Sequence, residues 1–366
     1  MHVLVTGGGS GGHVIPTIPI MERLLANGHR VSFVGTRSGY ESGLLKAVAV
    51  DYYGISAGKL RRYSSWANVR DAGRVVLGVI EALRLVRRLR PDVIFSKGGF
   101  VAFPVVLAGW MCRVPVLGHE SDFSPGLANR LSQPFLRVLC TSFAQTPVHG
   151  FRGRIVHTGT PLREAMLTGD PHRARQQFRL VQEKPLLLVT GGSLGAVALN
   201  KVVRAALPAL LPLFEVVHVC GPGRIEAIES AGYHQFEFIN EGWGDLFALA
   251  SVIVSRAGAN SLFELLSLGK LNLLIPLPAA ASRGDQLENA DYARQQGYSL
   301  VIPESRLNET TLVAGIDELL QHRLQYEQRL AAFARVDATE LLTTELLVLA
   351  GTVLSGSGRP SNQARK

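Results

Sequence analysis

The chain has 366 residues, of which 47% are hydrophobic and 18% are charged. This composition supplies a large core and excludes a disordered chain, and the length predicts two or three domains. Three widely spaced cysteines, at positions 112, 140 and 220, exclude a disulfide framework or a cysteine-based zinc site and fit a reducing compartment. The net charge of +9 leaves open which anionic partner the chain meets.

Strand and helix patterns alternate along the first half of the chain. Apolar runs typical of buried strands occupy residues 3–6, 31–34, 92–96, 114–117 and 138–141. Between them, apolar residues at helical spacing occupy segments such as 16–26 and 75–90. This alternation predicts an α/β fold in which a parallel sheet carries helices on both faces.

The same alternation starts again midway. Strands are predicted at residues 186–190, 216–220, 236–239, 251–255 and 272–276. The motif TGGGSGG at 6–12 follows the first strand, and TGGSLGA at 190–196 follows the strand that opens the second half. This internal echo predicts two Rossmann-like domains in tandem.

The domain boundary is expected near residues 159–163, where the sequence TGTP at 158–161 interrupts the pattern. Residues 1–160 would form the N-terminal domain and residues 161–334 the C-terminal domain. A helix at about 335–354 would pack back on the first domain. Residues 355–366 are rich in Gly, Ser, Pro and Arg, which predicts a disordered tail.

Both glycine loops are suited to binding an anion. A strand that runs into a glycine turn and a helix presents backbone N–H groups and the positive end of the helix dipole. Gly7, Gly9 and Gly12 also match the dinucleotide pattern G-x-G-x-x-G, but that site needs an acid after the next strand, and residues 31–37 contain none. A nicotinamide dinucleotide is therefore disfavoured. Either loop alone could be a tight structural turn, whereas two in matching positions favour a binding role.

A third loop, at residues 255–264, also follows a strand and opens a helix. Its helix N-terminus could hold a diphosphate, and Glu264 lies about one turn in, where a carboxylate could accept hydrogen bonds from ribose hydroxyls. The alternative is purely structural. In that interpretation Asn260 is an N-cap and Glu264 favours the helix dipole.

No segment of the sequence predicts a membrane-spanning helix. The most apolar stretch, 101–116, contains Pro104, Pro115 and Arg113, whereas a spanning helix needs about 20 apolar residues. The N-terminus lacks the basic region and the apolar length of a signal peptide. We therefore expect the chain to stay in the cytoplasm, with binding to a membrane surface still open to it.

Several motifs coincide in order and spacing. They are Gly8-Gly9-Ser10-Gly11-Gly12-His13-x-x-Pro16, Lys97-Gly98-Gly99-Phe100, His119-Glu120-Ser121-Asp122, Pro125-Gly126-Leu127-Ala128-Asn129, Gly191-Gly192-Ser193-x-Gly195-Ala196, Arg256-x-Gly258-Ala259 and Gln286-x-x-Asn289-Ala290. With these motifs the chain resembles the MurG family of peptidoglycan N-acetylglucosaminyltransferases, which convert lipid I to lipid II. The resemblance runs from the N-terminus to about residue 340. It implies a GT-B fold, in which two Rossmann-like domains with parallel sheets face each other across a cleft.

The resemblance also implies the substrates and their positions. The C-terminal domain would hold the donor, UDP-N-acetylglucosamine, with the backbone of Ile239 at the uracil and Glu264 at the ribose. Ser193 and the helix after Gly258 would hold the diphosphate. The matching donor positions are Arg163, Ser193, Ile239, Gly258, Ala259, Asn260, Ser261, Leu262, Phe263, Glu264 and Gln286. The acceptor, the muramoyl-pentapeptide on undecaprenyl diphosphate (lipid I), would meet Ser10, Gly11, Gly12, Asp122 and Asn129.

The implied reaction is an inverting displacement by the acceptor 4-hydroxyl. It needs a base near the hydroxyl and positive potential at the leaving diphosphate. His13 is the first candidate, because a helix start disfavours its protonation, and Glu120 and Asp122 compete with it. His13 could equally be a structural histidine. Asp122 stands where the family commonly has an amide. Arg163 or Arg256 could stabilise the leaving group; no cofactor is expected, and no D-x-D metal motif occurs.

The positive charge is concentrated in residues 59–90. This segment holds nine basic residues against two acidic ones, a net +7. Apolar residues beside arginines predict a surface for anionic lipid, with the chain peripheral on the cytoplasmic face of the membrane. A solvated face of an ordinary amphipathic helix is the alternative. The expected membrane contacts are Trp66, Arg70, Arg74, Val75 and Leu77. A nucleic-acid partner is disfavoured because no recognition motif is present.

Other functions remain open from the sequence. A GT-B UDP-N-acetylglucosamine 2-epimerase would share the donor and the tandem domains, but it would not need the basic, apolar segment. A GT-B diacylglycerol glycosyltransferase would share that segment and differ in the loop at residues 119–129. A non-enzymatic anion-binding protein would not need three separate loops.

Overall fold

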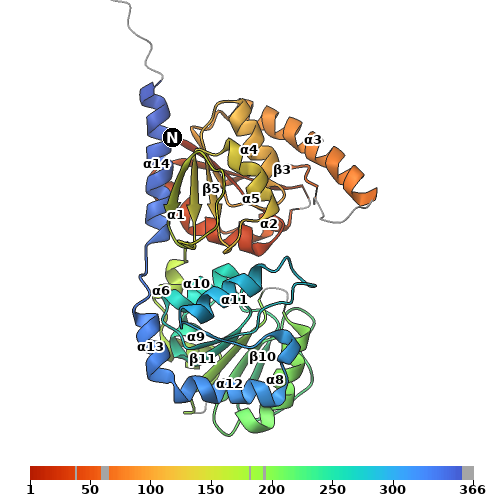
Figure 1. Cartoon of the computed structure of the whole chain (residues 1–366), viewed down its shortest axis with the longest axis vertical. Helices are drawn as coiled ribbons and strands as arrows, with labels where there is room; N and C mark the ends of the chain where they lie inside the picture. Colours follow the sequence, from red (N-terminus) through yellow and green to blue (C-terminus); the bar gives the residue numbers. More distant parts are fainter. Residues whose placement is uncertain (38, 59–65, 181–182, 193–194, 357–366) are drawn as a thin grey trace, which may run out of the picture. The chain divides into compact units, whose positions relative to one another are not determined.

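The computed structural model describes the chain except residues 38, 59–65, 181–182, 193–194 and 357–366 (Figure 1). The chain divides into two compact units. The first comprises Met1–Ser121, Pro125–Pro161 and Asp337–Lys366, and the second comprises Asp122–Ser124 and Leu162–Val336. The main crossing between them, after Pro161, falls in the segment where the sequence breaks its strand and helix pattern. The tail predicted at 355–366 lies almost entirely outside the described residues.

The first unit is built on a seven-stranded sheet in which every pair of neighbours is parallel. The strand order is β3-β2-β1-β4-β5-β6-β7. The strands are β1 (His2–Thr6), β2 (Arg30–Thr36), β3 (Asp51–Ile55), β4 (Val93–Ser96), β5 (Val116–Glu120), β6 (Val138–Thr141) and β7 (Arg154–His157). The helices are η1 (Gly11–His13), η2 (Ile15–Thr17), α1 (Ile18–Ala26), α2 (Tyr40–Leu44), α3 (Trp66–Leu89), α4 (Ala102–Met111), α5 (Leu127–Ser132), η3 (Gln133–Phe135) and α14 (Ala338–Gly356).

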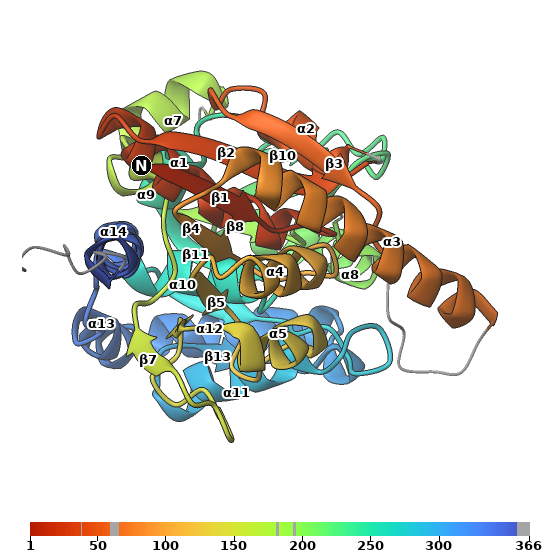
Figure 2. The ribbon, with the colours of Figure 1, turned by 90° about the horizontal axis from the view of Figure 1, so that it is seen from above.

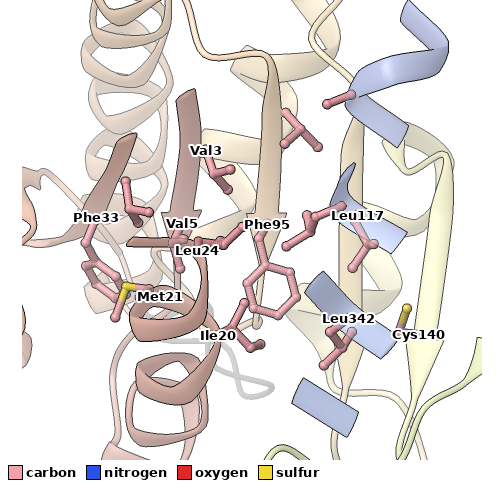
Figure 3. Packing of buried hydrophobic residues seen from close by; sticks show 14 of the residues in the cluster. Val3, Val5, Ile20, Met21, Leu24, Phe33, Phe95, Leu117, Cys140 and Leu342 are labelled. Carbon is pink, nitrogen blue, oxygen red and sulfur yellow. The ribbon is translucent and has the colours of Figure 1, made fainter. Parts of the chain in front are cut away.

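The C-terminal helix α14 completes the core of the first unit. Leu342 and Leu346 are fully buried and belong to the same apolar cluster as Val3 and Phe95 of the central strands (Figure 3). Residues four apart share one helix face. That face of α14 therefore packs on a sheet whose first strand lies more than 300 residues earlier, and α14 lies beside α1 (Figure 1).

The second unit repeats the plan with six parallel strands in the order β10-β9-β8-β11-β12-β13. These strands are β8 (Leu186–Thr190), β9 (Glu215–Val219), β10 (Tyr233–Phe236), β11 (Ala250–Ser255), β12 (Asn272–Leu274) and β13 (Leu300–Val301). The helices are α6 (Glu164–Leu167), α7 (Pro171–Gln177), α8 (Val197–Leu210), α9 (Trp243–Leu249), α10 (Ala259–Ser267), α11 (Asp285–Gln295), η4 (Glu304–Arg306), α12 (Glu309–Gln321) and α13 (Arg323–Ala331). Both units thus confirm the predicted α/β class with parallel sheets.

One predicted strand is misplaced, and three others are missing from the prediction. The strand predicted at 236–239 lies three residues earlier as β10, Tyr233–Phe236, and residues 237–239 are a loop. The missed strands are β3, β7 and β13. β3 and β7 are partly exposed edge strands and β13 has two residues, so none carries the continuous apolar run of a buried strand.

Strand order places the binding positions in each unit. In the first sheet, β2 and β3 extend the sheet on one side of β1, and the later strands β4 to β7 extend it on the other side. In the second sheet, β9 and β10 lie on one side of β8 and β11 to β13 on the other. Open α/β sheets bind ligands outside the carboxyl ends of strands at this switch point. The glycine loops after β1 and β8 begin there.

Helix α3 lies side by side with α4 on the first unit (Figure 2). α3 starts at Trp66, nine residues before the helical pattern that the sequence marks at 75–90. None of the helices in the described part of the chain combines the length and the apolar character needed to cross a membrane.

Candidate functional site

A cavity of about 320 Å³ opens beside the glycine loop after β1 in the first unit. Gly8, Gly9, Ser10 and His13 are among its lining residues. Gly9 has φ +88°, and a Cβ there would lie 2.3 Å from the ring of Phe100. Glycine is therefore required at this position both for the backbone conformation and for the close approach.

One tautomer of His13 follows from its partner. Nδ1 lies 3.2 Å from the backbone carbonyl oxygen of Lys97. A carbonyl oxygen can only accept a hydrogen bond, so Nδ1 carries a proton, and in the neutral imidazole the lone pair is on Nε2. The side chain is half-buried and lines the cavity. His13 therefore lies at the cavity, and the ring nitrogen that could accept a proton there is Nε2.

A buried carboxylate holds the glycine loop from behind. Glu41 is 1% exposed, and its Oε1 accepts a hydrogen bond of 2.9 Å from the Gly9 N–H. Its Oε2 accepts one of 2.6 Å from the Thr36 hydroxyl. The Gly9 N–H is therefore used inside the protein, whereas the Ser10 N–H makes no hydrogen bond among the described residues. No motif or spacing singles out Glu41, which is an isolated acid in the sequence.

We expect Glu41→Ala to loosen the glycine loop. The substitution leaves the Gly9 N–H without its acceptor, which costs about 1–3 kcal/mol of stability. Glu41→Gln keeps an acceptor oxygen and should recover part of the lost stability. Denaturant unfolding of the two variants checks this, and an unchanged unfolding midpoint in the alanine variant would contradict it.

The two carboxylates that compete with His13 are both engaged. Glu120 is 3% exposed, and its Oε2 accepts hydrogen bonds from the Gly126 N–H (3.0 Å) and the Asn129 amide (2.8 Å). Asp122, in the second unit, is ion-paired with Arg283 and accepts a hydrogen bond from Asn289. Both carboxylates are therefore held by partners within the protein, and the Asn129 amide is one of the groups that hold Glu120.

His119 is a buried connector. Its Nδ1 accepts a hydrogen bond of 2.8 Å from Lys97 Nζ, and its Nε2 donates one of 2.9 Å to the carbonyl oxygen of Gly159. Burial, reinforced by the Lys97 charge, holds the pKa of His119 well below its usual range. The imidazole therefore stays neutral and ties the end of β5 to the segment where the chain leaves the first unit.

The second unit presents a helix start without a side-chain cap. The N-cap of α10 is Gly258, in extended backbone, and no side chain caps it. The interpretation of Asn260 as the N-cap is therefore wrong, since Asn260 is the second helical residue. The first-turn N–H groups of α10, at residues 259–261, precede the first helical bond from Leu262 to Gly258. They are suited to an anion.

Not all side chains of the predicted donor-binding run 258–263 can reach a ligand. Leu262 is fully buried and Phe263 is 4% exposed, and Phe263 packs edge-on against Phe333. Their side chains belong to the core of the second unit. The partly exposed residues of the run are Gly258, Asn260 and Ser261, whereas the Ala259 side chain is only 5% exposed.

Glu264 is half-buried on the same helix, and its carboxylate makes no hydrogen bond within the described part of the chain. Burial raises the pKa of Glu264 to about 7, and the positive charge of Arg163 opposes that rise. Arg163 itself keeps a buried Nε without a hydrogen-bond partner among the described residues. An acid and a guanidinium with unused hydrogen-bonding capacity are suited to a polar ligand.

Other predicted donor residues are partly engaged. The carbonyl oxygen of Ile239 accepts a hydrogen bond of 2.9 Å from Trp243 Nε1, so its N–H is the group better placed for a base. Gln286 Oε1 accepts a hydrogen bond of 3.0 Å from the Leu277 N–H, so the oxygen of its amide is used and the NH₂ group points away from Leu277. Ser193 lies outside the described residues.

Arg256 has an internal role. Its guanidinium is 7% exposed, donates a hydrogen bond of 3.0 Å to the carbonyl oxygen of Ile275 and is ion-paired with Glu304. A side chain buried and paired in this way is not available to a leaving diphosphate. Of the two arginines predicted for that task, Arg163 fits and Arg256 does not.

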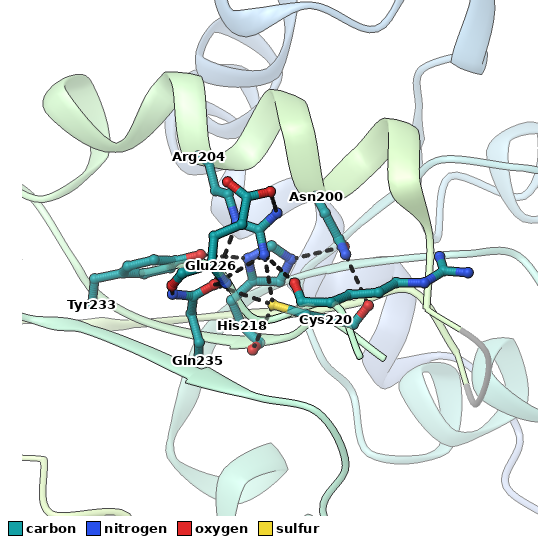
Figure 4. Close-up of polar contacts among 8 residues, drawn as sticks. Asn200, Arg204, His218, Cys220, Glu226, Tyr233 and Gln235 are labelled. Carbon is teal, nitrogen blue, oxygen red and sulfur yellow. Dashed lines mark hydrogen bonds and ion pairs between the residues drawn. The ribbon is translucent and has the colours of Figure 1, made fainter. Parts of the chain in front are cut away.

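A polar network supports the loop after β8 (Figure 4). His218 accepts a hydrogen bond of 2.9 Å from Tyr233 OH at Nδ1 and donates one of 3.1 Å to Asn200 Oδ1, and the Asn200 amide donates one of 2.8 Å to the carbonyl oxygen of Cys220. That carbonyl would lie 2.0 Å from a Cβ at Gly195. The network therefore fixes the backbone against which the second glycine loop packs.

Within the described residues, no group of three or more His, Cys, Asp or Glu side chains lies together in an arrangement suited to a metal ion.

Two Rossmann-like units, with glycine loops and an open helix start at the carboxyl ends of their strands, define the GT-B class of glycosyltransferases. The solved structure of MurG from Acinetobacter baumannii matches with a TM-score of 0.75 and 25% identity, covering 95% of this chain and 99% of that one. UDP-GlcNAc 2-epimerase from Neisseria meningitidis matches with a TM-score of 0.69 at 14% identity, which is a likeness of fold alone.

The chain belongs to glycosyltransferase family 28. Residues 3–139 match the N-terminal domain of that family and residues 186–342 match its C-terminal domain. A UDP-N-acetylglucosamine--N-acetylmuramyl-(pentapeptide) pyrophosphoryl-undecaprenol N-acetylglucosamine transferase of Legionella pneumophila (strain Paris) is 42% identical over 341 residues, 92% of this chain and 94% of the relative. The relative of the same name from Lachnospira eligens is 45% identical over 326 residues, 88% of this chain and 92% of the relative. The predicted MurG-family membership and the enzyme class are confirmed.

Proposed function

We propose that this transferase moves N-acetylglucosamine from UDP-N-acetylglucosamine to the 4-hydroxyl of the muramoyl-pentapeptide on undecaprenyl diphosphate. The products are the lipid-linked disaccharide and UDP. The observation that carries the proposal is His13, which is fixed by the Lys97 carbonyl with Nε2 as its proton acceptor, beside a cavity at the carboxyl end of β1. An acceptor hydroxyl brought to that nitrogen can be deprotonated as it attacks.

The residues divide the chemistry between the units. As the acceptor oxygen forms its bond to the anomeric carbon, its proton passes to His13 Nε2, and the sugar–phosphate bond breaks with its electron pair leaving on UDP. The N–H groups at the start of α10 and the Arg163 guanidinium stabilise the charge that develops on the diphosphate. Glu264 accepts hydrogen bonds from the ribose hydroxyls, and the Ile239 N–H meets the uracil. Attack opposite the leaving group inverts the anomeric centre.

Transfer of labelled N-acetylglucosamine in detergent tests this function. The full chain is incubated with the labelled UDP-sugar and, separately, with the muramoyl-pentapeptide lipid, with diacylglycerol or with no acceptor. A labelled disaccharide lipid in the first reaction alone is the expected result. Labelled glycolipid from diacylglycerol would indicate a GT-B diacylglycerol glycosyltransferase. Epimerised sugar nucleotide in the reaction without an acceptor would indicate a UDP-N-acetylglucosamine 2-epimerase.

We further propose that the first unit docks on an anionic membrane surface through the paired helices α3 and α4. Among the side chains that the structure describes there, the exposed apolar ones are Val76 (61%), Leu77 (44%) and Ile80 (43%) on α3, with Trp110 (55%) and Met111 (50%) on α4. Exposed arginines, including Arg74, lie on α3 among them. Apolar side chains beside basic ones suit a lipid surface. Trp110 and Met111 were not predicted, and the side chains of Trp66 and Arg70 lie outside the described structure.

Vesicle co-sedimentation checks the docking face. Leu77→Glu combined with Trp110→Glu should reduce binding to vesicles that contain anionic lipid by at least about tenfold, since charge replaces buried apolar area. Leu324→Glu is the matched control, because Leu324 is 75% exposed on the second unit. Equal binding by the double variant and the control would contradict the assignment.

A further inference from the structure

The cavity beside the first glycine loop is polar on one side and apolar on the other. Its polar side is the backbone of Gly8 and Gly9 with Ser10 and His13. Its remaining lining is largely apolar: Val75 of α3, Phe100 and Phe103 at the start of α4, and Leu127, Ala128 and Leu131 of α5. A site with one polar and one apolar wall fits an amphiphile.

We infer that the apolar wall binds the first isoprene units of the acceptor's polyprenyl chain. The inference rests on the proposed function, because it needs an acceptor that carries a polyprenyl diphosphate. In such a lipid a single oxygen joins the diphosphate to the first isoprene carbon. When the diphosphate lies at the glycine loop, where the Ser10 N–H makes no hydrogen bond among the described residues, the first isoprene units must lie within a few ångströms of it. Phe100 of the apolar wall lies at such a distance, since a Cβ at Gly9 would be 2.3 Å from its ring.

The side chains of the apolar wall remain accessible. Leu127 and Leu131 are 37% and 39% exposed. Leucines one helical turn apart on α5 line the same cavity, where burial under a prenyl chain would remove their apolar surface from water. The membrane-docking face has its own exposed residues, Val76, Leu77, Trp110 and Met111, and none of them is among the lining residues. Chain binding and membrane docking can therefore be separated by mutation.

Two acceptors and three variants test the inference without a membrane. The acceptors are water-soluble muramoyl-pentapeptide diphosphates, one bearing a two-isoprene chain and the other a methyl group. Leu131→Trp and Ala128→Leu fill the apolar side from different positions. Ile155→Trp is the control, since Ile155 is 50% exposed on β7 of the same unit and does not line the cavity. Thermal unfolding of each full-length variant verifies that it is folded.

The wild-type chain and Ile155→Trp should show a KM on the order of tenfold lower for the prenyl acceptor than for the methyl acceptor, as expected for burying a few methylene groups. Either folded cavity-filling variant should lose this preference while its KM for UDP-N-acetylglucosamine stays unchanged. A preference that persists in both variants, or that is missing from the wild-type chain, overturns the inference. Absence of transfer to either acceptor by the wild-type chain would instead refute the proposed function.

Discussion

Replacing His13 by alanine should lower kcat for transfer to the lipid acceptor by about 10²- to 10⁴-fold, the usual contribution of a positioned general base. The affinity for UDP should not change, because the groups proposed to hold the nucleotide belong to the second unit. The physical reason is the fixed tautomer: with Nδ1–H donating to the Lys97 carbonyl, Nε2 is the only ring nitrogen able to take the acceptor proton. Single-turnover rates at saturating substrates measure the effect.

A matched control separates chemistry from folding. His149 is an exposed histidine of the same unit outside any cavity lining described here, and His149→Ala should retain wild-type rates. If His13→Ala keeps kcat within a factor of about two of the control, His13 has the structural role that the sequence also allowed, and another group must take the proton.

Replacing Glu264 by glutamine should weaken UDP binding by about 10- to 100-fold at pH 8, since hydrogen bonds to a charged acceptor contribute about 1.5–3 kcal/mol. The pKa of Glu264 in the free enzyme is raised to about 7 by burial. The proposed hydrogen bonds from the ribose hydroxyls are strongest to the ionised carboxylate, so UDP affinity of the wild-type chain should rise with pH through about 7 and level off above it. The glutamine variant should lack this step in calorimetric titrations.

The same raised pKa has the opposite consequence for stability. A carboxyl whose pKa is higher in the folded chain stabilises the fold at low pH and loses that contribution as pH rises through about 7. Glu264→Gln should therefore unfold at a higher denaturant concentration than the wild-type chain at pH 8, with a smaller difference at pH 5. Glu288→Gln, at an exposed position on α11, is the control and should show neither effect. A destabilised Glu264→Gln at pH 8 would contradict the account.

Much of this fold could be predicted from the sequence because its central strands are buried on both faces. A strand such as β1, with all five residues buried, carries an apolar core at residues 3–5, which can be recognised in the sequence. Edge strands have no such constraint. β7 is mostly exposed, and its position depends on its pairing with β6, which its own four residues do not specify.

The candidate site likewise has features that neighbouring residues specify and features that depend on residues far away in the sequence. Glycine loops are local, so the loops after β1 and β8 and the start of α10 could be found from their motifs. Whether a polar side chain is available depends on partners far away in sequence. Arg256 is paired with Glu304, 48 residues later, and Glu41 reaches Gly9 across 32 residues. No spacing rule encodes these pairs, which is why Arg256 was included and Glu41 was missed.

The central claim is that the nucleotide is held by the second unit while the base acts from the first. Calorimetric titration of UDP into full-length His13→Ala and Glu264→Ala tests it most directly. The account predicts wild-type affinity in His13→Ala and a loss of at least about tenfold in Glu264→Ala. Weakened binding in His13→Ala together with unchanged binding in Glu264→Ala would contradict it.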